Sequence, residues 1–193
     1  MITTERKLIF VALVLVLVLA GLLIWPEKLA PNRLPPGGEF TLNSADGPVS
    51  LTSLRGKVVL LYFGYTYCPD ICPTALLTHA AAFKQLTPEE LRRVAGLFVS
   101  VDPERDSLAH LKQYAHFFHP VIAGLTGTPA EIQEIAARYG VFYARQPPDD
   151  SGRYSVDHTS ESYLIAADGR LVARLPHASP PETIAAEIRR WLP

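Results

Sequence analysis

Both cysteines of the chain lie in one short segment, YTYCPDICPT, at positions 68 and 72. The spacing C-x-x-x-C has one residue more than the C-x-x-C redox motif of thioredoxin. Such a pair can close a disulfide, and it can also hold one soft metal ion between two thiolates. Because thiolates select copper(I), zinc or iron–sulfur clusters, and two thiolates leave most of these ions short of ligands, a metal site here needs a third ligand from elsewhere in the chain.

The sequence around the cysteines predicts a strand followed by a helix. Residues 57–65, KVVLLYFGY, are typical of a buried strand, and residues 73–86 are typical of a helix. In open α/β sheets, ligands bind at the carboxyl ends of strands, where Cys68 and Cys72 fall. The unpaired N–H groups and the positive dipole end of a helix N-terminus also stabilise thiolate. We therefore expect reactive sulfur at this position.

Six histidines are candidates for the third ligand. Five of them have ordinary explanations. His110, His116 and His119 are polar groups on or beside one amphipathic helix, His79 is a packing or surface group in the helix after the cysteines, and His177 is a loop residue. His158 differs because it stands immediately before a buried strand, in VDHTSESYLI, and loops at strand ends often carry function. The competing interpretation is a histidine hydrogen-bonded within its loop by Asp157 or Ser160.

The rest of the chain alternates short apolar runs with helical patterns. We expect strands at 94–101, 121–124, 163–166 and 171–175, the last two forming a hairpin, and helices at 108–118, 129–139 and 181–191. Residues 144–154 are typical of a solvent-exposed loop. This order predicts an α/β domain with a central sheet and helices on both of its faces.

The N-terminal region predicts membrane attachment. Residues 8–24 contain no charge, and as a helix they span about 26 Å, close to the hydrocarbon thickness of a bilayer. Arg6 and Lys7 precede this run and Trp25 follows it, as expected of an uncleaved signal anchor with a cytoplasmic N-terminus. A cleaved secretory signal is the alternative interpretation.

These patterns divide the chain into four parts: a cytoplasmic N-terminus at 1–7, a transmembrane anchor at 8–25, a linker rich in proline and glycine at 26–38, and a folded domain at 39–193. The domain should face the periplasm or the outside of an inner membrane. A formal net charge of -1 argues against a nucleic-acid partner, which normally requires a basic patch.

Four stretches, in matching order, resemble the Sco (SenC) family of copper-binding cytochrome c oxidase assembly proteins. They are YFGYTYCPDICPT, SVDPERDS at 100–107, GLTGT at 124–128, and VDHTSESYLI. The resemblance runs from about Glu39 to the C-terminus, and an N-terminal anchor is also typical of the family. It implies a thioredoxin-like fold in which Cys68, Cys72 and His158 bind copper. Two thiolates and one imidazole suit trigonal Cu(I), and Cu(II) needs a further ligand.

The resemblance also implies a function. We expect a membrane-anchored metallochaperone, rather than an enzyme, that helps assemble the binuclear copper centre of cytochrome c oxidase. Its partners would be the copper-centre subunit of the oxidase, another copper chaperone and a thiol reductant. The alternative is a thiol-disulfide reductase in which Cys68 and Cys72 keep the recipient's cysteines reduced. A peroxiredoxin-like peroxidase fits less well, because such an enzyme needs a threonine two residues further from the reactive cysteine than Thr66 is.

The family-like run DPERD, residues 102–106, has a structural interpretation as well as a functional one. It follows a predicted strand and could contact a partner. We favour a structural role, in which Asp106 caps the helix at 108–118 and Arg105 forms an internal salt link.

Overall fold

The computed structural model describes residues 12–16 and 34–193. Of the predicted membrane anchor, only residues 12–16 are described, and they are helical, whereas the remainder of segment 8–25 lies outside the described residues. Within the described ranges, no helix has the length and apolar character needed to cross a bilayer. Leu34–Pro193 forms a compact unit, and the following description concerns this unit.

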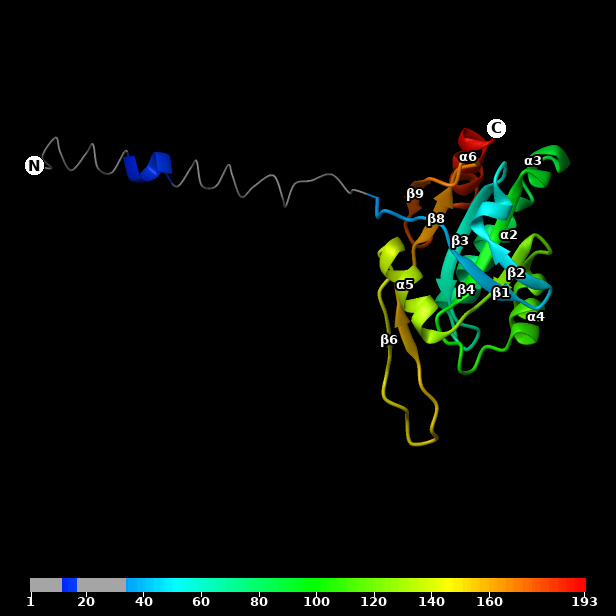
Figure 1. Cartoon of the computed structure of the whole chain (residues 1–193), viewed down its shortest axis with the longest axis horizontal. Coiled ribbons are helices and arrows are strands. Elements are labelled where there is room, and N and C mark those ends of the chain that lie inside the picture. The colour runs from blue at the N-terminus through cyan, green and yellow to red at the C-terminus, as the bar shows by residue number, and fades with distance from the viewer. Residues whose placement is uncertain (1–11, 17–33) are drawn as a thin grey trace, which may run out of the picture. The chain divides into compact units, whose positions relative to one another are not determined.

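A mixed sheet of five strands forms the centre of the domain (Figure 1). The strands are β3 (Val58–Gly64), β4 (Val94–Ser100), β5 (Ile122–Leu125), β8 (Ser162–Ile165) and β9 (Leu171–Leu175), in the spatial order β5-β4-β3-β8-β9. β3, β4 and β5 run parallel, whereas β8 is antiparallel to both β3 and β9. Every residue of β3 and β4 is buried, because helices cover both faces of the sheet. The predicted mixed α/β, thioredoxin-like architecture is confirmed.

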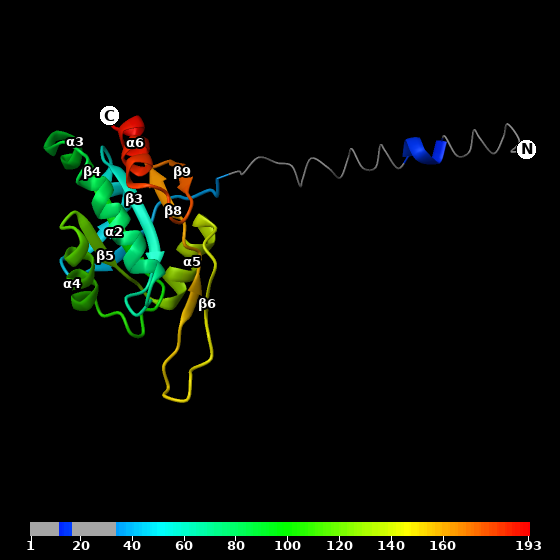
Figure 2. The same ribbon diagram turned by 180° about the vertical axis from the view of Figure 1, so that it is seen from behind.

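Alternating side chains of β3 show which helix covers which face. The Tyr62 ring contacts His79 of α2 (Ile71–Phe83), and α6 (Pro181–Trp191) packs beside α2 (Figure 2). The next side chain, Phe63, points to the opposite face and contacts Tyr139 of α5 (Pro129–Tyr139). Successive strand residues point to opposite faces, so β3 anchors helices on both.

Two further helices complete the helical part of the described domain. α4 (Leu108–Phe118) follows β4 and packs against β5 and α2. The short α3 (Pro88–Arg92) precedes β4, and Thr87 caps it with a reciprocal capping box. A 3₁₀ turn, η1 (Leu51–Leu54), precedes β3.

Two small hairpins lie outside the central sheet and were not expected from the sequence. β1 (Thr41–Ser44) pairs with β2 (Gly47–Ser50), and β6 (Tyr143–Arg145) pairs with β7 (Val156–His158). The prediction of a loop over 144–154 is therefore wrong at its start, where residues 144 and 145 belong to β6. His158 is the last residue of β7, so a strand rather than a loop carries it.

The first turn of α2 differs from the prediction in a way that matters for the cysteines. The helix begins at Ile71, two residues earlier than expected, and ends at Phe83. Cys72 therefore lies inside the first turn, where its backbone N–H has no partner four residues earlier in the helix. Pro73 is tolerated here because the first turn does not use its missing N–H.

The loops after β3 and β4 are joined by a buried carboxylate. Asp106 accepts hydrogen bonds from the backbone N–H and the hydroxyl of Thr66, and from the hydroxyl of Ser100. The prediction that Asp106 caps α4 is therefore wrong, and Ser107 caps that helix instead. The predicted salt link of Arg105 is confirmed, with Asp102 as its partner.

Candidate metal centre

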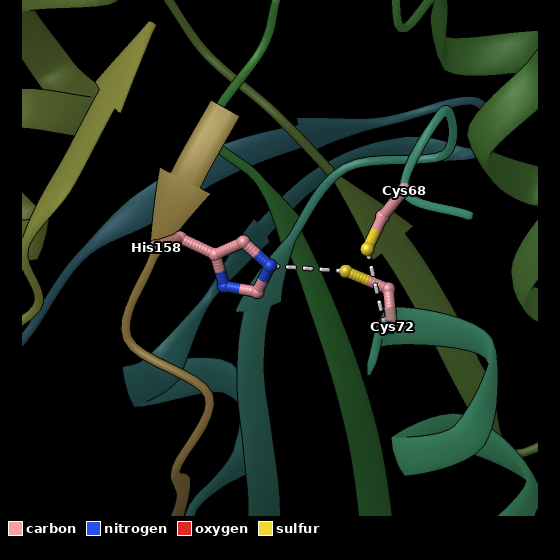
Figure 3. A group of neighbouring side chains, drawn as sticks. All are labelled: Cys68, Cys72 and His158. Atoms are coloured by element: carbon pink, nitrogen blue, oxygen red, sulfur yellow. Dashed lines mark hydrogen bonds between the residues drawn. The ribbon is translucent and has the colours of Figure 1, made fainter. Parts of the chain in front are cut away.

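Three elements bring Cys68, Cys72 and His158 together (Figure 3). Cys68 lies in the loop after β3, Cys72 in the first turn of α2, and His158 at the end of β7. One potential ligand atom from each lies within 4.8 Å of the others. In the described part of the chain, these three residues form the one His, Cys and carboxylate group whose atoms converge closely enough to hold a metal ion.

Hydrogen bonds fix how the three side chains face one another. His158 Nε2 lies 3.2 Å from Cys72 Sγ, and the backbone N–H of Cys72 donates to Cys68 Sγ at 3.4 Å. On the other side of the ring, His158 Nδ1 lies 2.9 Å from the carbonyl oxygen of Thr159. A carbonyl only accepts, so Nδ1 carries the proton and Nε2 presents its lone pair to the sulfurs. This is the tautomer that a metal ligand requires.

Burial is unequal across the group. Cys72 is completely buried, whereas Cys68 and His158 are half-buried. A groove of about 370 Å³ opens beside them, and it is lined by Tyr65, Cys68, Pro69, Asp70, Ile71, Ser155, Val156, Asp157 and His158. A molecule entering this groove therefore reaches Cys68 and His158 before Cys72.

Gly64 and two tyrosines shape the space around the ligands, and sequence reasoning did not identify them. A methyl group at Gly64 would lie 2.7 Å from Cys72 Sγ, so only glycine leaves room for the sulfur here. The rings of Tyr62 and Tyr65 meet the His158 ring edge-on, with centroids 6.1 Å and 5.9 Å away. The sequence did carry a signal for this, because a glycine at the end of a strand rich in β-branched and aromatic residues often marks a point where another group lies close to the backbone.

The two thiols differ in acidity because they share one hydrogen bond. The Cys72 thiol donates to the Cys68 sulfur, and this bond, together with the backbone N–H groups of Cys72 and Asp70, lowers the pKa of Cys68 to about 3 although burial opposes the shift. The same bond, followed by burial, raises the pKa of Cys72 above its ordinary value. Cys68 is therefore the thiolate of the pair, and Cys72 keeps its proton.

The other histidines do not join this group. His79 is buried, its Nε2 lies 2.7 Å from the hydroxyl of Ser162, and burial lowers its pKa to about 4. It is a packing residue, one of the two roles considered for it. His119 contacts the ring of Phe83, and His110 that of Tyr67. Neither Asp157 nor Ser160 hydrogen-bonds to His158 in the described region; the partner of Nδ1 is the Thr159 carbonyl, and Nε2 faces Cys72.

The fold and this group define a thioredoxin-like protein with two cysteines and one histidine at the edge of its sheet. A model of the SCO1/SenC family matches residues 30–193, and the chain therefore belongs to the SCO1/SenC family.

Similar proteins agree with this assignment. The mitochondrial SCO2 homolog of Bos taurus is 40% identical over 157 residues, which cover 80% of this chain and 59% of that protein. The structure of Bradyrhizobium japonicum ScoI with copper bound has a TM-score of 0.74 and 40% identity, and the match covers 81% of this chain and 99% of that one. BsSco, described as having a disulfide switch, matches with a TM-score of 0.64 and 29% identity over 82% of this chain and 94% of its own.

The unequal acidity of the thiols leads to a kinetic prediction. In the reduced full-length protein, alkylation of Cys68 by iodoacetamide should proceed at a nearly constant rate from about pH 5 to about pH 8, because an ordinary thiol, but not a preformed thiolate, gains roughly tenfold per pH unit. Cys72→Ala removes the donor, raises the pKa of Cys68 and should restore a rising profile. Mass spectrometry of the modified peptide measures both rates. A steep profile for wild-type Cys68 would contradict this account of the pair.

Proposed function

We propose that the chain binds one copper ion through Cys68 Sγ, Cys72 Sγ and His158 Nε2. The observation that carries the proposal is the convergence of two sulfurs and one correctly oriented imidazole nitrogen at a half-buried site. Thiolate and imidazole are soft to intermediate ligands, and a three-coordinate set of this kind suits Cu(I). Cu(II) would require a further oxygen or nitrogen ligand. Copper is here a cargo, and the domain is its carrier.

We propose further that this copper is delivered to the copper-centre subunit of cytochrome c oxidase, a haem–copper oxidase. Support comes from relatives: Bradyrhizobium japonicum ScoI was solved with copper bound, and BsSco is described as a member of a family of cytochrome c oxidase assembly proteins. Another copper chaperone would supply the metal. The chain spans 59% of the length of the Bos taurus relative. We therefore only propose, for this chain, the activity of that whole protein.

The unequal burial of the ligands supports transfer by ligand exchange. Incoming thiolates of a recipient reach Cys68 and His158 from the groove and can displace them one at a time. Cys72 lies completely buried beneath them and would release the ion last. Because each step replaces one bond by another, tight binding and rapid transfer are compatible.

A second candidate function, thiol-disulfide reduction, is favoured by the acidity of the pair. The Cys68 thiolate would attack a disulfide of the recipient, forming a mixed disulfide and releasing one recipient thiolate. Cys72 would then lose its proton and attack Cys68 Sγ, which releases the second recipient thiol and leaves a Cys68–Cys72 disulfide. An external thiol reductant must return the pair to the dithiol. Copper binding also needs both thiols reduced, so the two functions can be successive states of one cycle.

We also propose that residues 8–25 anchor the protein in the inner membrane. The support is the uncharged run at 8–24 with Arg6 and Lys7 before it. Residues 1–7 would lie in the cytoplasm, 26–38 would form a linker, and the domain at 39–193 would face the periplasm. This arrangement would bring the site close to oxidase subunits in the same membrane.

Copper binding gives the direct test of the first proposal. Titration of Cu(I) into the reduced full-length protein, against a competing chelator, should show about one tightly held ion per molecule. His158→Ala and Cys72→Ala should each weaken binding by more than roughly a hundredfold, since loss of an outer partner alone costs up to that much. His116→Ala, at an exposed position of α4, is the matched control and should bind as the wild type does.

The same variants separate the two candidate functions. If copper affinity collapses in His158→Ala while disulfide exchange survives, histidine serves the metal and the cysteines serve both reactions. If copper binding is weak and does not change in His158→Ala, the proposed metal site is wrong and the reductase function remains.

Membrane attachment is tested by fractionation. The full-length chain should stay in the pellet when membranes are washed with alkaline carbonate, because an apolar helix of about 17 residues or more resists extraction. A variant that lacks residues 8–25 should appear in the soluble fraction. Release of the full-length chain by carbonate would rule out a transmembrane anchor.

A further inference from the structure

The Arg105 side chain joins three segments of the chain near Cys68, Cys72 and His158. It stands in the loop after β4 and contacts residues of the loop after β3 and of the segment that leads into β7. Only about a fifth of the side chain is exposed, at 20%. None of the functions proposed above uses this residue.

The polar contacts of Arg105 hold the hairpin β6–β7 to the loop after β4. Arg105 Nε donates to Asp102 Oδ2 at 2.5 Å, and Nη1 donates to the carbonyl oxygen of Tyr154 at 2.8 Å. Tyr154 makes a second hydrogen bond to the same loop, because its hydroxyl donates to Asp102 Oδ1 at 2.9 Å. Asp102 is itself buried. Charge-assisted bonds at a buried carboxylate are about twice as strong as neutral ones, so this is a firm link.

The stacking contacts of Arg105 extend the link to the cysteine loop. Its guanidinium carbon lies 3.5 Å from the centre of the Tyr154 ring, 4.8 Å from that of Tyr67 and 5.6 Å from that of Tyr65. Tyr67 directly precedes Cys68 and Tyr65 lies three residues before it. The Tyr65 ring also meets the His158 ring edge-on at 5.9 Å. Arg105 is thus connected to the histidine through Tyr65 on one side and through β7 on the other.

The hairpin needs such a link because it is weak by itself. β6 and β7 have three residues each and form a sheet separate from the central one. A two-stranded hairpin is marginally stable in water. One ion pair, Arg145 with Glu104, also joins the hairpin to the domain, but both side chains are more than half exposed, at 52% and 67%, and such pairs contribute little.

We propose that Arg105 is a positioning residue, which sets the distance of His158 from the two sulfurs by clamping β7 to the cysteine loop. The inference rests on the proposed copper site. Arg105 touches neither sulfur nor imidazole in this arrangement and acts through Tyr154 and Tyr65. The planar guanidinium provides both the fork of donors and the stacking face, so lysine, which keeps the charge, does not replace it.

A double-mutant cycle on copper affinity tests the proposal. Cu(I) dissociation constants are measured for the reduced full-length wild type, Arg105→Lys, His158→Ala and the double variant. Arg105→Lys should weaken binding roughly tenfold or more when His158 is present, as expected for loss of a charge-assisted bond, and should have almost no effect in the His158→Ala background. Arg153→Lys is the matched control, because Arg153 lies at the tip of the same hairpin and its side chain pairs with Asp149 of that tip.

An equal loss of affinity in both backgrounds would overturn the proposal, because Arg105 would then stabilise the domain without acting through the histidine. Unchanged affinity in Arg105→Lys would overturn it as well. If His158→Ala bound Cu(I) as tightly as the wild type does, the result would instead contradict the proposed copper site.

A second measurement does not need copper. In the metal-free protein, hydrogen exchange of the β6–β7 amides should accelerate roughly tenfold or more in Arg105→Lys and stay unchanged in Arg153→Lys. Unchanged exchange in Arg105→Lys would overturn the clamp whether or not the protein binds copper.

Discussion

The buried sulfur of Cys72 is the constraint on which the site depends. It lies at the start of α2 against the end of β3, in a space that exists because residue 64 has no side chain. Burial prevents this sulfur from moving to meet its partners, so Cys68 and His158 must be brought to it. The sheet does this by ending β3 beside the helix N-terminus, and the hairpin β6–β7 does it by presenting His158 from the opposite side.

One hydrogen bond between the two thiols gives the pair an asymmetry that suits both proposed reactions. Cys68, half-buried and with a depressed pKa, meets the groove as a thiolate and can start either ligand exchange or attack on a disulfide. Cys72 is buried and protonated in the empty site. After losing its proton it would hold a metal until last, or resolve a mixed disulfide. The histidine distinguishes the two proposed reactions, because the proposed metal site uses its nitrogen and disulfide exchange does not.

Much of this arrangement could be predicted from the sequence, because buried strands and amphipathic helices have clear periodic patterns. The strands predicted at 57–65 and 94–101 agree with β3 and β4 to within a residue at each end, and the helix predicted at 129–139 is α5. The hairpin β6–β7 was not predicted, since strands of three residues flanking a loop with two prolines carry no periodic signal. His158 was singled out as one candidate by its place before a strand, but only the family resemblance made it the expected ligand. Asp106 was misassigned because its hydrogen-bond partners, Thr66 and Ser100, come from other segments of the chain.

X-ray absorption at the copper edge of the Cu(I)-loaded protein tests the central claim most directly, because it counts the atoms bound to the metal. The account predicts two sulfur ligands and one nitrogen with the multiple-scattering pattern of imidazole, and loss of the nitrogen signal in His158→Ala. Two sulfurs alone in the wild type, or a copper neighbour that indicates a cluster between molecules, would contradict a site built from Cys68, Cys72 and His158 of one chain.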